Sequence, residues 1–287
     1  MVKLEVDVRG RPLKCSIYMG DYSKNVLDDA KRLLDNNWDY VAGYFGDEGD
    51  GKTTASFIHA YYLNADFNIS KVAFNGRQFE ECVLNANEYD CVVWEEADDL
   101  TGHWASKVIQ TLKRMFKRIR MKKLFIILNT PSMFDLGKYF VIHRLRAVWH
   151  IYADGFDRGF IRFFNKENKR GLYINGFKIW DMYAWRPNFV DRFGKIPEGF
   201  PIDMSPGGEY ERKKEEALHD IEDVNPKFKK SSALIKLDRL LFQKRNDPVA
   251  LKRPFYLTQE EYSFIFEMDR SNISKMLIKY NEREDVG

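Results

Sequence analysis

The sequence predicts an α/β fold built on a mostly parallel sheet, and three observations predict it. Short apolar runs typical of buried strands alternate with segments of helical periodicity between residues 39 and 152. A glycine-rich segment, Gly46–Thr54, separates one of those runs from the helix after it. Another apolar run, Cys91–Trp94, is followed by two carboxylates. Alternation of this kind places helices on both faces of the sheet.

The composition is typical of a globular chain with a proper core. The 287 residues are 44% apolar and 31% charged, with a formal net charge of +3. Three widely spaced cysteines and five histidines show no disulfide or metal-ligand pattern. The charged N-terminus lacks the apolar centre of a signal peptide, and no apolar run is long enough to span a bilayer. We therefore expect a soluble cytoplasmic protein with no membrane partner.

Each element of the predicted fold follows from local periodicity and turn residues. The predicted strands are Lys3–Val8, Leu13–Tyr18, Asp39–Phe45, Lys71–Phe74, Asp90–Glu95, Lys123–Leu128 and Arg146–Tyr152. The predicted helices are Lys24–Asn37, Thr53–Leu63, Gly76–Ala86, His103–Arg120 and Met133–Ile142. Strand, loop and helix thus succeed one another around the glycine-rich segment, which is the context that a phosphate-binding loop needs.

The glycine-rich segment fits the pattern G-x-x-x-x-G-K-[ST] in full. Its glycines let backbone N–H groups turn inward, and the following helix adds its positive N-terminal end. Lys52 is expected to reach the β- and γ-phosphates, and the Thr53 hydroxyl to join the shell of a Mg²⁺ ion. The alternative is a glycine-rich turn with a chance lysine. The residues predicted to bind ATP are Gly46, Asp47, Glu48, Gly49, Asp50, Gly51, Lys52, Thr53 and Thr54.

Two acidic residues at the end of an apolar strand predict hydrolysis rather than binding alone. Glu95 is expected to hold Mg²⁺ together with Thr53, and Glu96 to polarise the attacking water as a general base. The alternative is a solvated acidic strand end ahead of helix-capping residues. Asn129 follows the next apolar strand and is expected to orient water beside the γ-phosphate. An equal alternative is that Asn129 only forms a turn ahead of the proline at position 131.

These motifs together resemble a known group of ATPases. The phosphate-binding loop, the strand ending in Glu95 and Glu96, and Asn129 are similar to RecA-like P-loop ATPases with an additional strand and a catalytic glutamate. Within that group the chain resembles FtsK/HerA-type DNA pumps, zonular-occludens-toxin-like phage ATPases and viral DNA-packaging ATPases. The resemblance covers residues 38–152. The group usually carries Asp-Glu where this chain has Glu95 and Glu96, so the predicted metal ligand is one methylene longer.

A basic helix follows the acid pair. Residues 101–134 contain no acidic side chain, and their basic residues leave one helix face strongly positive. The alternative is an ordinary solvated surface helix. The resemblance implies an arginine that acts on the neighbouring subunit's γ-phosphate, for which Arg120 comes first and Arg118 second, with Arg144 and Arg146 as a weaker pair. The resemblance therefore implies a homo-oligomeric ring.

The character of the chain changes after residue 153. We expect a hairpin of Phe160–Phe164 with Gly171–Ile174 across a turn at Asn165–Arg170, then an extended arm over Trp180–Pro206. Charged and basic helices are predicted at Tyr210–Ile221 and Lys229–Arg245. The expected domains are N-terminal strands and helix (1–37), the ATPase domain with its hairpin (38–178), the arm with the charged helix (179–225) and a small helical domain (226–287).

The tail, Leu257–Leu277, resembles a helix-turn-helix. Residues 226–280 carry 12 Lys/Arg against 6 Asp/Glu, which suits an anionic partner. Arg270 and Lys275 are among the side chains expected to face a major groove. Glu267 departs from the glycine on which such motifs usually turn. The alternative is a helical pair that packs on the ATPase domain or on another subunit.

The sequence therefore predicts an ATP- and Mg²⁺-dependent DNA translocase or packaging motor of viral or plasmid type. It would push on the DNA backbone, work as a ring and dock on a partner such as a capsid portal. One alternative is an ATP-switched DNA-binding regulator or replication initiator, in which the tail carries the specificity. A small-molecule kinase shares the phosphate-binding loop, but it normally lacks paired acids at a strand end and needs an acceptor site and lid that are not found here.

Overall fold

The computed structural model describes residues 1–95, 115–116, 118–155 and 157–224. Contacts between Cα atoms divide the chain into one compact unit, Met1–Ala217, and a second, Leu218–Gly287. The first unit holds the central sheet and the phosphate-binding loop. Of the second unit, the structure describes only the end of the helix α6 (Glu209–Val224).

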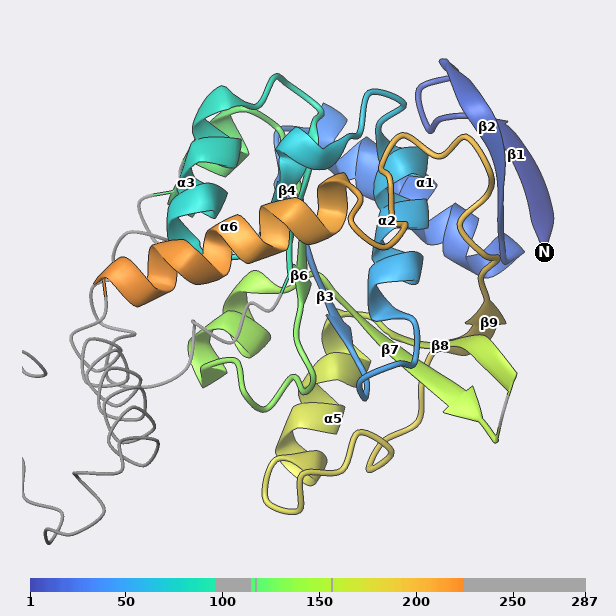
Figure 1. Cartoon of the computed structure of the whole chain (residues 1–287). Coiled ribbons are helices and arrows are strands. Elements are labelled where there is room, and N and C mark those ends of the chain that lie inside the picture. The colour runs from blue at the N-terminus through green and yellow to red at the C-terminus, as the bar shows by residue number, and fades with distance from the viewer. Residues whose placement is uncertain (96–114, 117, 156, 225–287) are drawn as a thin grey trace, which may run out of the picture. The chain divides into compact units, whose positions relative to one another are not determined.

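A seven-stranded sheet forms the centre of the first unit, in the order β4-β5-β6-β3-β7-β8-β9 (Figure 1). The five strands from β4 to β7 are parallel, and β8 and β9 are antiparallel to their neighbours. The bounds are β4 (Val72–Ala73), β5 (Cys91–Trp94), β6 (Phe125–Asn129), β3 (Tyr40–Phe45), β7 (Ala147–Asp154), β8 (Asp157–Phe164) and β9 (Phe189–Arg192). Because β6 lies between β3 and β5, the carboxyl ends of these three strands meet at one edge.

Side chains that alternate along the strands give the sheet two apolar faces, as the pleat requires. Tyr44 and Trp149 face the core that includes α1 (Asp21–Asp35) and α2 (Lys52–Leu63). Phe45 and Trp94 face the core that includes α3 (Gly76–Asn85) and α5 (Lys166–Gly176). Both faces are therefore covered, which explains why the central strands are continuously apolar.

The N-terminal strands form a separate antiparallel pair, β1 (Val2–Val6) and β2 (Pro12–Met19). Their turn is held by Asp7, which is 2% exposed. Its carboxylate accepts hydrogen bonds from the backbone N–H groups of Arg9 and Arg11 and from Nε of Arg11. The two strands and the helix expected after them are confirmed, although α1 begins and ends earlier than predicted.

The predicted hairpin with its turn at Asn165–Arg170 is wrong. Gly171–Ile174, expected as the second strand, lies in α5. The Asn165 side chain accepts hydrogen bonds from two N–H groups of the first turn, which favours a helix start. Lys169 and Leu172, three residues apart, are both buried on one helical face. The hairpin that does form pairs β7 with β8.

The arm predicted over Trp180–Pro206 also needs correction, because part of it belongs to the sheet. Phe189–Arg192 is the edge strand β9, antiparallel to β8. Its first residue stacks on Phe163 at 4.8 Å between ring centroids. Asp191, also in β9, accepts hydrogen bonds from N and Oγ of Ser23 in α1. Four residues are too few to show a strand period among prolines and glycines.

The helix predicted at Met133–Ile142 begins later than expected. Ser132 starts a turn instead, since its hydroxyl accepts a hydrogen bond from Phe134 N and its carbonyl from Asp135 N. Helical residues follow from 138, ending in a π-helical turn, η3 (Phe140–Arg144). In the part of the chain that the structure describes, each helix is too short or too polar to cross a lipid bilayer.

Several predictions lie outside the described residues. These are Glu96, most of the basic helix (residues 103–114 and 117), the helix Lys229–Arg245 and the helix-turn-helix-like tail. The helix expected at Tyr210–Ile221 is confirmed as part of α6.

Candidate functional site

The phosphate-binding loop joins β3 to α2, as predicted, and two of its glycines are required by their geometry. Gly46 has φ 149°, and a Cβ there would lie 2.1 Å from the carbonyl oxygen of Ile151 in β7. Gly51, with φ 96°, is the left-handed residue from which α2 starts. Only glycine adopts such conformations readily. The chain thus enters the loop pressed against β7 and leaves it directly into a helix.

The first turn of α2 presents backbone donors to the loop. Its first hydrogen bond runs from Ala55 N to the carbonyl oxygen of Gly51. The N–H groups of Lys52, Thr53 and Thr54 therefore have no acceptor inside the helix. Gly51 provides no side-chain cap, and the first turn has no acidic residue. A helix start of this kind, after a glycine-rich loop, is suited to an anionic ligand such as a phosphate group.

The Lys52 ammonium group is folded back over the loop. Its Nζ donates hydrogen bonds of 2.7 Å to the carbonyl oxygens of Gly46 and Asp47. Burial lowers the pKa of Lys52, although the nearby carboxylates of the loop and of Glu95 act in the opposite direction. The cation is therefore held at the mouth of the loop by weak acceptors, which the more negative oxygens of a phosphate would replace.

Glu95 connects the loop to the neighbouring strand. It follows β5, is 5% exposed and remains in register with β4 through a 2.8 Å hydrogen bond from its N to the Ala73 carbonyl. Its Oε2 accepts a hydrogen bond from the Thr53 hydroxyl at 3.2 Å. Its Oε1 accepts one from Nδ2 of Asn129 at 2.6 Å. Three residues from three segments thus meet at the carboxyl edge of the sheet.

The structure adds Ser56 to this cluster, a residue that the sequence reasoning missed. The Ser56 hydroxyl accepts a 2.8 Å hydrogen bond from Nδ2 of Asn129 and donates one of 3.0 Å to the Thr53 carbonyl. Ser56 is completely buried in an otherwise apolar stretch of α2. A small polar residue among buried apolar ones, one helical turn after Thr53, could have indicated from the sequence that Ser56 belongs to this cluster.

The oxygen atoms around Glu95 fit a magnesium ion that is shared with a phosphate. The Thr53 hydroxyl oxygen and Glu95 Oε2 lie 3.2 Å apart. Adjacent ligands of an octahedral Mg²⁺ at 2.0–2.1 Å lie about 3 Å apart. Within the described ranges no cluster of three or more His, Cys, Asp or Glu side chains is suited to hold a metal. The donor set therefore suits an ion that takes its other ligands from water and substrate.

The loop is unusually acidic for one that binds phosphates. Asp47 and Glu48 are exposed, while Asp50 is half-buried. The Oδ2 atom of Asp50 accepts a 3.0 Å hydrogen bond from Asp47 N and so stabilises the loop from within. These three carboxylates surround the single cation of the loop, Lys52. A negatively charged ligand must therefore overcome repulsion that Mg²⁺ would reduce.

An aromatic and cationic pocket lies next to β7, the strand that Gly46 of the loop contacts. It has a volume of about 430 Å³ and includes Arg162, Tyr183 and Trp185 in its lining. The Arg162 guanidinium group is 4.4 Å from the centroid of the Tyr183 ring, which is 56% exposed. Burial raises the pKa of Tyr183, and the Asp50 and Asp47 carboxylates contribute. The Tyr183 ring is 5.0 Å from the His150 ring and 6.3 Å from the Tyr152 ring, and these two residues flank Ile151, whose carbonyl oxygen contacts Gly46 of the loop.

Arg120, the first of the predicted arginines, lies away from the loop of its own chain. Arg118 and Arg120 are both exposed. Nε of Arg120 donates a 3.3 Å hydrogen bond to the Asn37 carbonyl, and its guanidinium group is 5.7 Å from the Trp38 ring centroid. Those residues precede β3, whereas the loop follows it. The structure therefore brings Lys52, Thr53, Glu95 and Asn129 together, and it leaves Arg120 near the amino end of β3, at the opposite edge of the sheet.

Solved structures that resemble the chain include two weak likenesses. The N-terminal domain of zonular occludens toxin from Neisseria meningitidis has a TM-score of 0.36 and 12% identity, covering 56% of this chain and 95% of that one. AMPPCP-bound DnaA from Aquifex aeolicus has a TM-score of 0.32 and 11% identity, covering 97% of this chain and 92% of that one. No protein-family model and no curated protein sequence matches the chain. Scores this low carry no argument about function.

The assignment of the fold rests instead on the molecule's own geometry. A glycine-rich loop with Lys52 and Thr53 joins the central strand β3 to α2. The strand β6 separates β3 from β5, whose end carries Glu95. The sheet is mostly parallel, with helices on both faces. The chain therefore has a mixed α/β fold with a mostly parallel central sheet, which is consistent with that of a P-loop NTPase.

Proposed function

We propose that the protein hydrolyses ATP and couples hydrolysis to the movement of DNA. The observation that carries the proposal is the hydrogen-bonded cluster of Thr53, Glu95 and Asn129 beside the phosphate-binding loop. A protein that only bound phosphate would need the loop alone. A buried carboxylate and an amide at the adjacent strand ends supply what hydrolysis requires: a metal ligand and a group that positions water.

Each residue of the site has a distinct role in this proposal. Lys52 and the N–H groups of the α2 N-terminus bind the β- and γ-phosphates. Thr53 and Glu95 hold Mg²⁺, which, when bound, neutralises charge that develops on the phosphate oxygens. Asn129 orients the attacking water. Glu96, which directly follows Glu95 in the chain, takes the proton from that water.

The pocket next to β7 is the proposed site for the base of ATP. Tyr183 presents an exposed ring, and Arg162 is held against it. A flat, electron-rich base stacks well on such a surface. Tyr183→Ala is expected to weaken ATP binding about tenfold and to leave inorganic phosphate binding unchanged. Tyr22→Ala, which removes an equally exposed ring from α1, is the matched control.

The proposed active form is a ring of identical subunits that acts on the DNA backbone. Arg120, or Arg118 in its place, would complete the neighbouring subunit's site, since both are exposed and Arg120 lies away from its own loop. The basic face of the helix predicted at His103–Arg120 would contact DNA phosphates, and the basic tail would recruit the protein to duplex DNA. A capsid portal or similar nucleoprotein is the proposed docking partner.

The deciding experiment measures ATP turnover by the full-length chain with and without random-sequence duplex DNA. We expect stimulation by DNA that falls steeply with salt. Glu96→Gln is expected to abolish turnover while ATP still binds. Turnover that DNA does not stimulate, or that survives Glu96→Gln, would contradict the motor. Slow turnover with site-specific footprints would instead favour an ATP-switched regulator.

A mixing experiment tests the shared site. Subunits that carry Arg120→Ala are combined with subunits that carry Lys52→Ala, and native mass measurement with a non-hydrolysable ATP analogue reports ring assembly. If each site needs both residues from different subunits, the mixture will recover activity that neither variant has alone. A mixture no more active than the sum of its parts would place both residues outside a shared site.

A further inference from the structure

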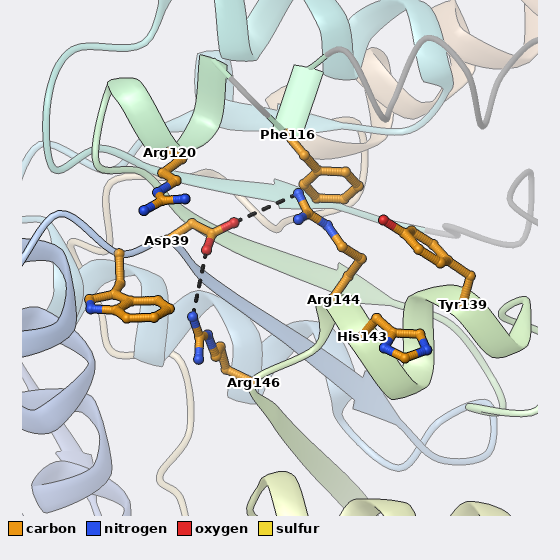
Figure 2. A pocket seen from close by; sticks show the side chains of 8 residues that line it. Asp39, Phe116, Arg120, Tyr139, His143, Arg144 and Arg146 are labelled. Carbon is orange, nitrogen blue, oxygen red and sulfur yellow. Dashed lines mark ion pairs between the residues drawn. The ribbon is translucent and has the colours of Figure 1, made fainter.

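A second cationic pocket lies at the edge of the sheet opposite to the phosphate-binding loop. It has a volume of about 480 Å³. Figure 2 shows the side chains of Arg120, Arg144 and Arg146 gathered around the single carboxylate of Asp39. Asp39 directly precedes β3 and Arg146 directly precedes β7. Because β3 has six residues, the strand separates this pocket from the loop by about 20 Å.

The single carboxylate of Asp39 forms ion pairs with Arg144 and Arg146 but cannot balance the charge of the three guanidinium groups. Arg144 Nη2 is 3.7 Å from Asp39 Oδ2, and Arg146 Nη2 is 3.9 Å from Asp39 Oδ1. Both distances exceed that of a charge-assisted hydrogen bond. Among the described residues, the side chains of Arg144 and Arg146 donate no hydrogen bond, and Arg144 Nε is buried without a partner. Three guanidinium groups thus face one carboxylate, and the side-chain N–H groups of Arg144 and Arg146 remain available as hydrogen-bond donors.

Aromatic rings hold two of these guanidinium groups in place. The Arg144 guanidinium is 4.0 Å from the centroid of the Phe116 ring, and that of Arg146 is 4.7 Å from the Trp38 ring. Stacking of this kind fixes the plane of each group while its N–H edges stay available. The pocket is therefore arranged before any ligand arrives, which reduces the entropy that binding costs.

The rim of the pocket adds flat apolar surface to the charge. The Trp38 side chain is 46% exposed, and Tyr139 is 45% exposed. Both residues line the pocket together with the arginines. A simple inorganic anion would make no use of these rings. A phosphate attached to an aromatic base uses both features, because bases stack on exposed aromatic side chains.

We propose that this pocket binds a nucleotide unit, with its phosphate on Arg144 and Arg146 and its base against Trp38 or Tyr139. The unit has two possible sources that share this chemistry: one nucleotide of a single-stranded nucleic acid, or a free nucleotide. The nucleic-acid source rests on the proposed function, since it would supply a contact for the moving strand. The free nucleotide does not, and it would make the pocket a second nucleotide site.

The test uses the full chain with Lys52→Ala, so that the phosphate-binding loop contributes nothing. Fluorescence anisotropy measures binding of a labelled oligo(dT) of about 12 nucleotides at several salt concentrations. Calorimetry with AMP forms the free-nucleotide arm. Arg146→Gln and Trp38→Ala are each expected to weaken binding about tenfold, and Arg146→Gln to make it less dependent on salt. Arg77→Gln, which removes an arginine that is 72% exposed elsewhere, is the control.

Arg144→Lys is a second variant in case another substitution prevents folding. It keeps the positive charge and loses only the planar guanidinium group with its paired N–H donors. It too is expected to weaken binding. Oligo(dT) binding that depends on the pocket assigns the nucleic-acid source, and AMP binding alone assigns the free nucleotide. The proposal is overturned if these substitutions leave both ligands unaffected, or if they change only the oligomeric mass, which would mean that an acidic group of another chain occupies the pocket. ATP turnover with Lys52 intact is scored separately, so either proposal can fail alone.

Discussion

The Thr53 hydroxyl donates a hydrogen bond to Glu95 Oε2 across 3.2 Å, although 42 residues of chain separate the two. Glu95→Gln keeps the size of the side chain and removes its charge, so we expect the affinity for MgATP to fall about tenfold or more. The affinity for ATP in excess EDTA should change little. Calorimetry under the two conditions measures the difference, and an equal loss in both would mean that Glu95 holds no metal.

Ser56 is expected to position Asn129 without touching the substrate. Ser56→Ala removes an acceptor from a buried amide, which costs about 1–3 kcal/mol where nothing replaces it. Turnover should fall while the KM for ATP stays near its original value, because phosphate binding by Lys52 is untouched. Ser70→Ala, at an exposed site, is the control. A rise in KM with unchanged turnover would assign Ser56 to ATP binding instead.

The carboxylates of the loop are expected to weaken the binding of ATP. Asp50→Asn removes a charge beside Lys52 and keeps an oxygen that can accept the hydrogen bond from Asp47 N. ATP binding at low ionic strength should tighten about threefold, and the gain should shrink as salt screens the charges. Glu81→Gln makes the same charge change on α3 and should have no effect. Weaker binding by Asp50→Asn would mean that this carboxylate itself helps to hold the ligand.

Two buried histidines predict a loss of stability in acid. Burial lowers the pKa of His59 to about 3, and burial with the neighbouring Arg162 lowers that of His150 to about 4. Since the unfolded side chains have a pKa of about 6.5, the unfolded state binds more protons below that pH. Each histidine therefore contributes stability above pH 6.5 that is lost as the pH falls towards its folded value, by about 1.4 kcal/mol per pH unit.

His150→Phe isolates one part of this effect. Nδ1 of His150 is buried without a hydrogen-bond partner among the described residues, so its replacement by phenylalanine breaks no hydrogen bond of that atom. Chemical denaturation from pH 7 to pH 4 should give a shallower loss of stability than in the original chain, with similar stability at pH 7. An unchanged pH dependence would show that His150 titrates normally in the folded state.

The sequence predicted the parts of the fold that depend on local order. The loop from Gly46 to Thr53 carries its own strand and helix signals, so its conformation follows from about eight residues. The proximity of Glu95 and Asn129 could be predicted because parallel strands end at a common edge. The helix α5 was missed because Gly171 and the turn-forming asparagine Asn165 suggested a hairpin, whereas that asparagine starts a helix.

Contacts between distant segments were beyond sequence reasoning. Nothing local indicates that Phe189–Arg192 pairs with β8, since the segment is recognised only through its partner strand. Tyr183 lies in the same aromatic segment, and it packs against His150, Tyr152 and Arg162 of two strands that are distant in the sequence. The cationic pocket around Asp39 depends likewise on the strand order, which brings the amino ends of β3 and β7 side by side.

The most direct test of the central claim is the release of phosphate from ATP by the full chain, with Mg²⁺ and with EDTA, compared with Lys52→Ala. Lys24→Ala, which removes a lysine of α1, is the matched control. We predict hydrolysis that requires Mg²⁺, falls about a hundredfold or more in Lys52→Ala and is unchanged in Lys24→Ala. Hydrolysis by Lys52→Ala at the original rate would contradict the account.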